Sequence, residues 1–133
     1  MFIQRLINQG NAPLLEQQLR FTQARHRLLA ENLVNASTPG YKQKDLDETK
    51  FNEMLRDRLA LRKQSAPGSV GFDDITADAI SPHANILFHD RNNRSMEQLM
   101  SDFSKNGLKH NMYAELLRKS YGSIQSALRE RVS

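Results

Sequence analysis

Four histidines and a group of carboxylates are the residues of this chain that could do chemistry. His83, His89 and Asp90 lie close together in the sequence, and imidazole and carboxylate groups are common zinc ligands. Their spacing matches no standard ligand pattern, so a solvated loop explains them better than a metal site. The chain has no cysteine, which excludes disulfides, thiolate metal ligands and a cysteine nucleophile.

The carboxylates between Asp45 and Glu53 are interleaved with Lys44 and Lys50, as is typical of a solvated helix face. The sequence contains neither a Gly-x-Ser-x-Gly nucleophile motif nor a glycine-rich phosphate loop. We therefore expect no enzyme activity, no cofactor and no metal.

Basic residues gather in two stretches, which are Arg20, Arg25 and Arg27, and then Arg56, Arg58, Arg62 and Lys63. Each stretch has acidic residues nearby, and neither is interleaved with aromatic residues as in many nucleic-acid-binding surfaces. The formal net charge of +4 permits anionic partners without requiring them. We expect solvated helix faces and no nucleic acid partner, although a basic helical nucleic-acid-binding protein remains an alternative.

The first element that must position these residues is a long amphipathic helix after Pro13, which suits a first helical turn. Its apolar seam steps by four and three residues, the heptad pattern of packed helices. The seam consists of Leu15, Leu19, Thr22, His26, Leu29, Leu33 and Ala36. A flanking stripe of Leu14, Phe21 and Leu28 widens the apolar face, which favours packing in a bundle. The pattern ends at Pro39-Gly40, which fits the centre of a type II turn.

A second heptad pattern runs from about Ser95 to Arg131. Its seam is Met96, Leu99, Phe103, Asn106, His110, Tyr113, Leu117, Ser120, Ile124 and Ala127, and a parallel stripe is Met100, Gly107, Ala114, Tyr121 and Leu128. We favour one long helix with a soft spot at Gly107 over two helices that join there. If the terminal helices pair, His26 and His110 could be neighbours, which would make assembly sensitive to pH near about 6.5.

Between the two patterns, residues 45–63 predict a shorter helix with Asp45 and Asp47 as capping side chains. Residues 64–71 form a loop rich in Ser, Pro and Gly, and Ala84–Phe88 could be a short extended piece. We predict an all-α protein in which two long terminal helices pair as a coiled-coil-like hairpin. Residues 1–41 and 93–133 would form one discontinuous domain, and residues 42–92 would hold the short helix and an irregular, flexible middle.

The apolar share of 38% is low for a self-contained globule of 133 residues. We therefore expect a protein whose wide helix faces lie largely unpaired in the monomer and are covered by other chains. The first ten residues lack the pattern of a Sec-type signal, and no apolar run approaches the roughly 18 residues of a membrane span.

One motif is more specific than these helices. The stretch Glu31–Lys42 carries Asn32, Asn35, Thr38, Gly40 and Tyr41 in the order Asn-x-x-Asn-x-x-Thr-x-Gly-Tyr. It resembles the signature of the axial proteins of the bacterial flagellum, and the short chain with both heptad ends is similar to the proximal rod proteins among them. The C-terminal part keeps the family's Asn92-Asn93, Met100 and Asn106, and it departs from the family at Arg94, Ser95, Leu99 and His110.

The resemblance implies a structural subunit of the flagellar rod that transmits torque from the MS ring. It implies self-association through the terminal helices and contacts with FlgC-like rod subunits, a FliE-like junction protein, the MS ring and the flagellar export apparatus. It also implies a periplasmic location, type III export without a cleaved signal, and no membrane insertion. The expected assembly seam comprises Leu15, Leu19, Leu29, Leu33, Met96, Leu99, Phe103, Tyr113, Leu117 and Ile124.

The motif residues have a mechanical interpretation. Asn32 and Asn35 can bond backbone groups near the helix end, and Thr38 can do so in the turn. Gly40 permits the reversal, and Tyr41 offers an apolar ring with a polar hydroxyl. We expect the motif to set the angle at which the chain leaves the first helix. A self-contained helical adaptor or chaperone, with the motif as an ordinary helix end, remains the main alternative.

Overall fold

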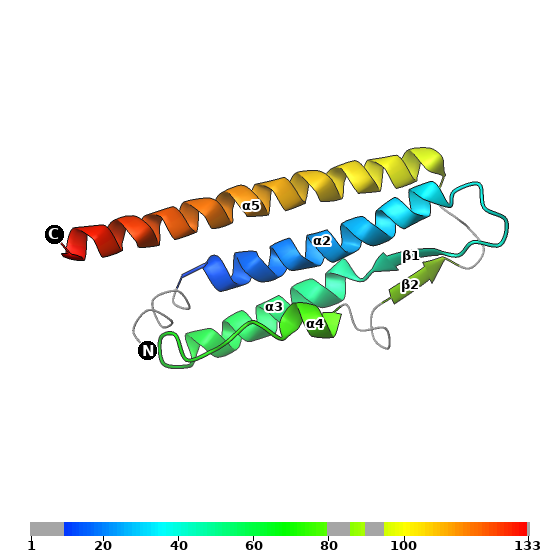
Figure 1. Cartoon of the computed structure of the whole chain (residues 1–133). Coiled ribbons are helices and arrows are strands. Elements are labelled where there is room, and N and C mark those ends of the chain that lie inside the picture. Colours follow the sequence, from blue (N-terminus) through cyan, green and yellow to red (C-terminus); the bar gives the residue numbers. More distant parts are fainter. Residues whose placement is uncertain (1–9, 80–85, 90–94, 133) are drawn as a thin grey trace.

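The computed structural model describes residues 10–79, 86–89 and 95–132. Its elements follow the order α2 (Ala12–Val34), β1 (Gln43–Leu46), α3 (Glu48–Lys63), α4 (Ile75–Ala79), β2 (Ile86–His89) and α5 (Met96–Val132). Figure 1 shows three layers, with α2 in the middle, α5 along one side of it, and α3, α4 and the two strands along the other. The fold is mostly helical, which confirms the predicted class.

The two long helices run antiparallel and pack along one another, which confirms the predicted hairpin (Figure 1). Leu15 and Leu29 of α2 and Leu99 of α5 are buried. With 37 residues, α5 is a single helix of about 55 Å that passes through Gly107 without a break. In Figure 1 its C-terminal end extends past the beginning of α2.

Replacing Gly107 with alanine is expected to stabilise the fold by about 0.8–1 kcal/mol, the helix-propensity difference between the two residues. The added methyl group would lie 3.6 Å from His26 Cε1, an ordinary van der Waals distance. Urea unfolding measures the gain. Gly122→Ala is the matched reference, since a Cβ there meets nothing within 4 Å. A loss of stability for Gly107→Ala alone would show that the two helices need the glycine in order to approach one another.

The short helix begins three residues later than the sequence predicts. Asp47 is its N-cap, as expected, and its side chain accepts a hydrogen bond from the Lys50 N–H at 3.1 Å. Asp45 was predicted to cap the helix as well, and this was wrong, because the residue lies in strand β1. Gln43–Leu46 carries no alternation of apolar and polar residues, so nothing local in the sequence indicates a strand there.

Strand β1 pairs with β2 in an antiparallel register that aligns Gln43 with His89 and Leu46 with Ile86. The predicted extended piece near Ala84–Phe88 is thus found as β2, and the predicted irregular middle contains a two-stranded sheet and α4. Pairing over four residues with a distant strand, rather than local propensity, makes Gln43–Leu46 extended.

The core lies between α2 and the middle of the chain. The ring of Phe21 stacks on that of Phe51, with centroids 4.0 Å apart and planes inclined by 6°. The other buried members of this core are Leu46, Leu55, Phe72, Ile75 and Ala79, with Leu14 and Leu28 packed against it. The flanking stripe of α2 is therefore covered within the same chain, whereas we had expected the wide helix faces to be covered by other chains.

Polar contacts fasten the middle to α2 and α3. The Thr76 N–H donates to Gln17 Oε1 at 3.0 Å, and Thr76 Oγ1 donates to the Gln17 carbonyl at 3.0 Å. Arg58 donates to both carboxylate oxygens of Asp74 at 2.7 and 2.8 Å. These hydrogen bonds hold the pKa of the Asp74 carboxyl below its usual value. The segment that was predicted as a flexible loop is therefore attached to the hairpin through specific contacts.

Candidate functional site

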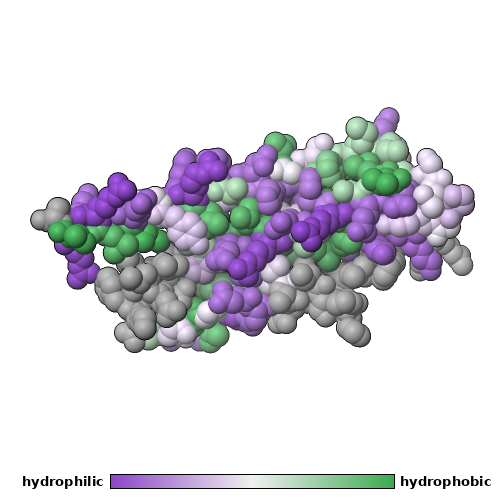
Figure 2. Space-filling model, viewed as in Figure 1, coloured by the Kyte–Doolittle hydropathy of each residue, from purple (hydrophilic) through white to green (hydrophobic). Residues whose placement is uncertain are grey.

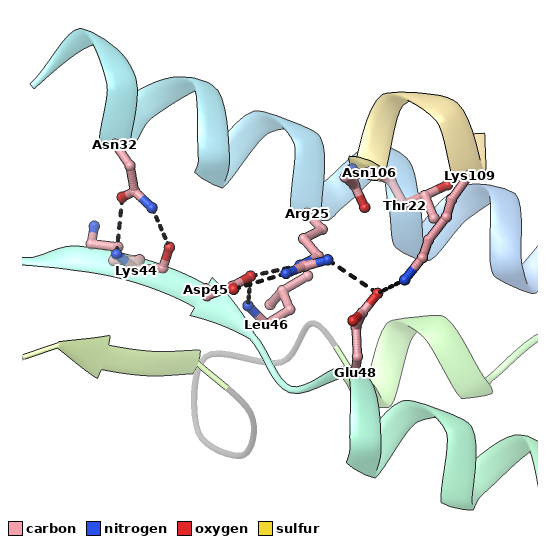
Figure 3. A network of polar contacts seen from close by, with 9 residues as sticks. All are labelled: Thr22, Arg25, Asn32, Lys44, Asp45, Leu46, Glu48, Asn106 and Lys109. Carbon is pink, nitrogen blue, oxygen red and sulfur yellow. Dashed lines mark hydrogen bonds and ion pairs between the residues drawn. The ribbon is translucent and has the colours of Figure 1, made fainter. Parts of the chain in front are cut away.

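Asn32, the first asparagine of the motif, has only 1% of its surface exposed. Its Nδ2 donates to the Lys44 carbonyl at 2.7 Å, and its Oδ1 accepts from the Lys44 N–H at 2.9 Å (Figure 3). A carboxamide presents the same donor and acceptor as a peptide group, so Asn32 acts on β1 as a neighbouring strand would. The side chain therefore holds the strand, whereas we had expected a bond near its own helix end.

The rest of the motif forms the turn. Asn35 Nδ2 donates to the Glu31 carbonyl at 2.9 Å, as expected for a side chain that satisfies a helix end. Thr38 Oγ1 donates to Asn35 Oδ1 at 3.3 Å. The Tyr41 N–H bonds the Thr38 carbonyl at 3.3 Å, and Gly40 has a φ of 76°. Both features fit the predicted type II turn, in which only glycine readily occupies the third position.

Tyr41 ends the motif with a half-buried ring. Its hydroxyl oxygen is buried and has no hydrogen-bond partner among the described residues. Burial, with a smaller contribution from the charge of Glu31, raises the pKa of the Tyr41 hydroxyl. The Tyr41 hydroxyl is thus a buried polar group that no described residue satisfies.

A charge network joins the four elements α2, β1, α3 and α5 (Figure 3). Arg25 of α2 binds both carboxylate oxygens of Asp45 in β1, at 2.8 and 3.1 Å, and its Nη1 lies 3.0 Å from Glu48 Oε1 at the start of α3. Lys109 Nζ of α5 reaches the same Glu48 oxygen at 2.9 Å. Burial alone would lower the pKa of Arg25, but the hydrogen bond to Asp45 and the charge of Asp45 raise it.

This network was missed by the sequence interpretation, which placed Arg25 on a solvated basic face. The side chains of Arg25 and Asp45 are 11% and 3% exposed, so the pair is buried. The sequence offers only a weak indication that Arg25 is buried: the residue precedes the seam residue His26 and does not lie on the face opposite the seam. The distance of 20 residues between the partners hides the pair from any local rule.

Polar side chains also lie between α2 and α5. Asn106, which is fully buried, donates from Nδ2 to the Thr22 carbonyl at 2.8 Å. Thr22 Oγ1 lies 3.2 Å from His110 Nδ1, and the His26 ring stacks on Phe103 with centroids 4.1 Å apart. These contacts fix one register of the two helices, because a buried amide finds its partner in one alignment only.

The structure places the predicted seam residues at different depths. Leu15, Leu29 and Leu99 are buried, and Met96 is half exposed. Leu19, Leu33, Phe103, Tyr113, Leu117 and Ile124 are partly buried. The seam of α2 is thus covered by α5 within one chain, instead of lying largely unpaired in the monomer as we had expected.

Among the described residues, the apolar side chains that remain uncovered belong mainly to α5. Seven of them on α5 are between 41% and 89% exposed, and they are Met96, Met100, Leu108, Met112, Leu116, Tyr121 and Val132. Leu108, Met112 and Leu116 follow one another at four-residue steps and therefore share one face, which we call the outer strip. Figure 2 shows hydrophobic surface at both ends of α5. Contiguous exposed apolar residues of this kind mark surfaces that bind other molecules.

Other kinds of site are not found in the part of the chain that is described. No group of three or more His, Asp or Glu side chains there could hold a metal ion. The side chains of His83, His89 and Asp90, and the stretch Asn92–Arg94, lie outside the described residues. None of the described helices combines the length and the apolar character that crossing a membrane requires.

The chain is similar to two rod proteins along most of its length. It is 26% identical over 118 residues to the flagellar basal body rod protein FlgB of Aquifex aeolicus, which covers 89% of this chain and 92% of that protein. It is 28% identical over 134 aligned residues to the flagellar basal body rod protein FlgB of Salmonella typhimurium, which covers 86% of this chain and 94% of that protein. No family model matches the sequence. Together with the turn motif and the paired terminal helices, these two similarities identify the chain as a structural subunit of the flagellar basal body rod that is similar to FlgB.

Proposed function

We propose that this rod subunit assembles through the α2–α5 hairpin and that the uncovered apolar residues of α5 are its contacts with neighbouring subunits. The observation that carries the proposal is the outer strip, where Leu108, Met112 and Leu116 are 70%, 51% and 41% exposed. Burying such residues stabilises an interface by about 25 cal/mol for each Å² of apolar surface removed from water.

The partners are those that the family resemblance implies. Association with other rod components follows from the similarity to FlgB. We propose FlgC-like subunits and further copies of this chain as lateral neighbours, and a FliE-like junction protein, the MS ring and the export apparatus at the base. In such an assembly each contact joins two different surfaces, since copies related by a helical operation do not face one another.

Residues 1–41 and 93–133 would then act as one discontinuous assembly domain. Its support is the packing of α2 against α5 and the bonds of Asn106 and His110 to Thr22. The motif would hold the middle of the chain at a fixed angle to this domain, because Asn32 binds β1 and Gly40 reverses the chain. Torque that acts on the hairpin would then be transmitted to residues 42–92 through a rigid connection.

The proposal is tested with a variant that carries Leu108→Ser, Met112→Ser and Leu116→Ser. Because these side chains are exposed, the variant is expected to keep its circular dichroism spectrum and its Tm within a few degrees. Its recovery in purified basal bodies is expected to fall by at least about tenfold, which corresponds to 1.4 kcal/mol at the contact.

Leu61→Ser on α3 is the matched control, since Leu61 is also about half exposed but lies on the other side of the molecule. It should leave recovery in basal bodies unchanged. Normal recovery of the triple variant would exclude the outer strip from the assembly contacts. A wild-type chain that is absent from basal bodies and stays a defined soluble oligomer would instead favour the helical adaptor.

A further inference from the structure

A groove of about 370 Å³ lies between α2 and α5 at the middle of the hairpin. Its lining consists of Gln23, His26, Arg27, Gly107, His110 and Asn111. Gly107 helps to leave this space open, because the absence of a side chain there exposes the facing ring of His26. The groove is thus built by both helices of the hairpin.

The groups around the groove share one chemical preference. Arg27 supplies a permanent positive charge, Gln23 and Asn111 carry amide donors, and each of the two imidazoles has at least one N–H. None of the described lining residues is acidic. Arg27 belongs to none of the ion pairs found among the described residues. Within the same residues, His26 Nδ1 is buried without a hydrogen-bond partner. A planar anion with two acceptor oxygens matches this set of donors better than a cation or a neutral group.

The apolar residues on either side of the groove indicate which kind of molecule supplies the anionic group. Gly107 belongs to the stripe of Met100, Gly107, Ala114, Tyr121 and Leu128, in which each step of seven residues spans two turns, or about 10.5 Å. Met100 and Tyr121, on either side of the groove, are 57% and 43% exposed. The stripe therefore presents uncovered apolar side chains on both sides of a polar centre. A free anion would use only the centre, whereas an amphipathic helix would use all three parts.

We propose that the groove receives a carboxylate side chain from an α-helix of an adjoining rod subunit, whose apolar residues cover Met100 on one side and Tyr121 on the other. The inference rests on the proposed function and adds the chemistry of the partner. A helix that lies along the stripe could slide by one heptad with little loss of apolar contact. The carboxylate prevents this, because a shift of one heptad would leave it on Met100 or Ala114, away from Arg27.

The first test measures the anion preference in the isolated full chain. Sodium acetate is titrated into the ¹⁵N-labelled protein at constant ionic strength, and the signals of the Gly107 backbone amide and the Gln23 and Asn111 side-chain amides are followed. We expect saturable shifts with acetate, none with the same concentrations of chloride, and at least about a threefold weaker response in Arg27→Gln, whose substituted side chain is exposed. Equal shifts in chloride, or no saturation, would overturn the proposal.

The second test measures assembly with Asn111→Asp, which places a negative charge at the rim of the groove. Asn111 is exposed, so the variant is expected to keep the wild-type Tm. We expect its recovery in basal bodies to fall by about tenfold, since like charges that face one another across an interface are strongly unfavourable. Asn52→Asp is the matched control, with the same chemical change at an exposed position on α3.

A failure of the carboxylate contact can be distinguished from a failure of the rod function. Wild-type recovery of both Asn111→Asp and Arg27→Gln would overturn the carboxylate contact and leave the rod function intact. If the wild-type chain is not recovered in basal bodies, both the proposed function and this inference fail.

Discussion

Replacing Asn32 with alanine is expected to lower the free energy of unfolding by about 2–4 kcal/mol, because two backbone groups of β1 lose their partner. The Lys44 N–H and carbonyl are each bonded to the Asn32 carboxamide, at 2.9 and 2.7 Å. A buried polar group that is left unpaired costs about 1–3 kcal/mol. Lys44 itself is half-buried, so water can replace part of the loss and the total stays below the maximum.

Equilibrium urea unfolding, followed by circular dichroism, measures this change. Asn35→Ala is the matched control, since the Asn35 side chain bonds a single backbone group, the Glu31 carbonyl at an exposed helix end, and otherwise only the exposed Thr38 hydroxyl. It should cost no more than about 1 kcal/mol, as for other single capping bonds. If both variants lose the same small amount, the bonds between Asn32 and β1 contribute little to stability, and the strand must be held by its pairing with β2.

The second large effect is expected for Arg25→Ala, with a loss of about 3 kcal/mol in the free energy of unfolding. The substitution leaves the Asp45 carboxylate buried without its guanidinium partner. Removing one member of a buried ion pair typically costs about 3–5 kcal/mol. Asp45 Oδ1 still accepts a bond from the Leu46 N–H at 2.8 Å, which places the expected loss at the lower end.

Arg20→Ala supplies the contrast on the same helix. Arg20 pairs with Glu16 at a spacing of four residues, and both side chains are substantially exposed. Such a pair contributes only about 0.3–0.5 kcal/mol. A double variant, Arg25→Met with Asp45→Leu, should recover most of the stability that Arg25→Ala loses, because it leaves neither member of the pair as a buried charge without its partner. A loss for Arg25→Ala no larger than that for Arg20→Ala would contradict the buried status of the pair.

The helices could be predicted because their signals are local. The four-and-three steps of Leu15, Leu19 and Leu29, and those of Leu99, Phe103 and Leu117, repeat often enough to define both helices and their packing face. Asp47 likewise marks the start of α3 through its own side chain. Strand β1 has no such signal. Gln43–Leu46 is extended because β2 and Asn32 bind it, and neither partner is close to it in sequence.

The polar contacts, too, could be predicted only where they depend on residues close together in the sequence. The motif residues Asn32 and Gly40 could be singled out, and Gly40 adopts the predicted positive φ. That Asn32 reaches β1 could not be predicted, since this depends on how far the chain travels before it turns back. The network of Arg25, Asp45, Glu48 and Lys109 depends on the rotation of two helices about their axes. The spacing of the charged residues along the sequence does not indicate this rotation.

The exposed thioethers of α5 have a further consequence. Met96, Met100 and Met112 are each about half exposed, and all three lie on the longest helix of the chain. Methionine is unbranched and polarizable, so it adapts its shape to different neighbouring surfaces at little cost. One helix can therefore fit against subunits that are not identical in sequence. Exposed methionine sulfur can also be oxidised by peroxide to the sulfoxide, which is polar. A chain that is oxidised before it is incorporated would therefore lose the ability of α5 to fit against different subunits.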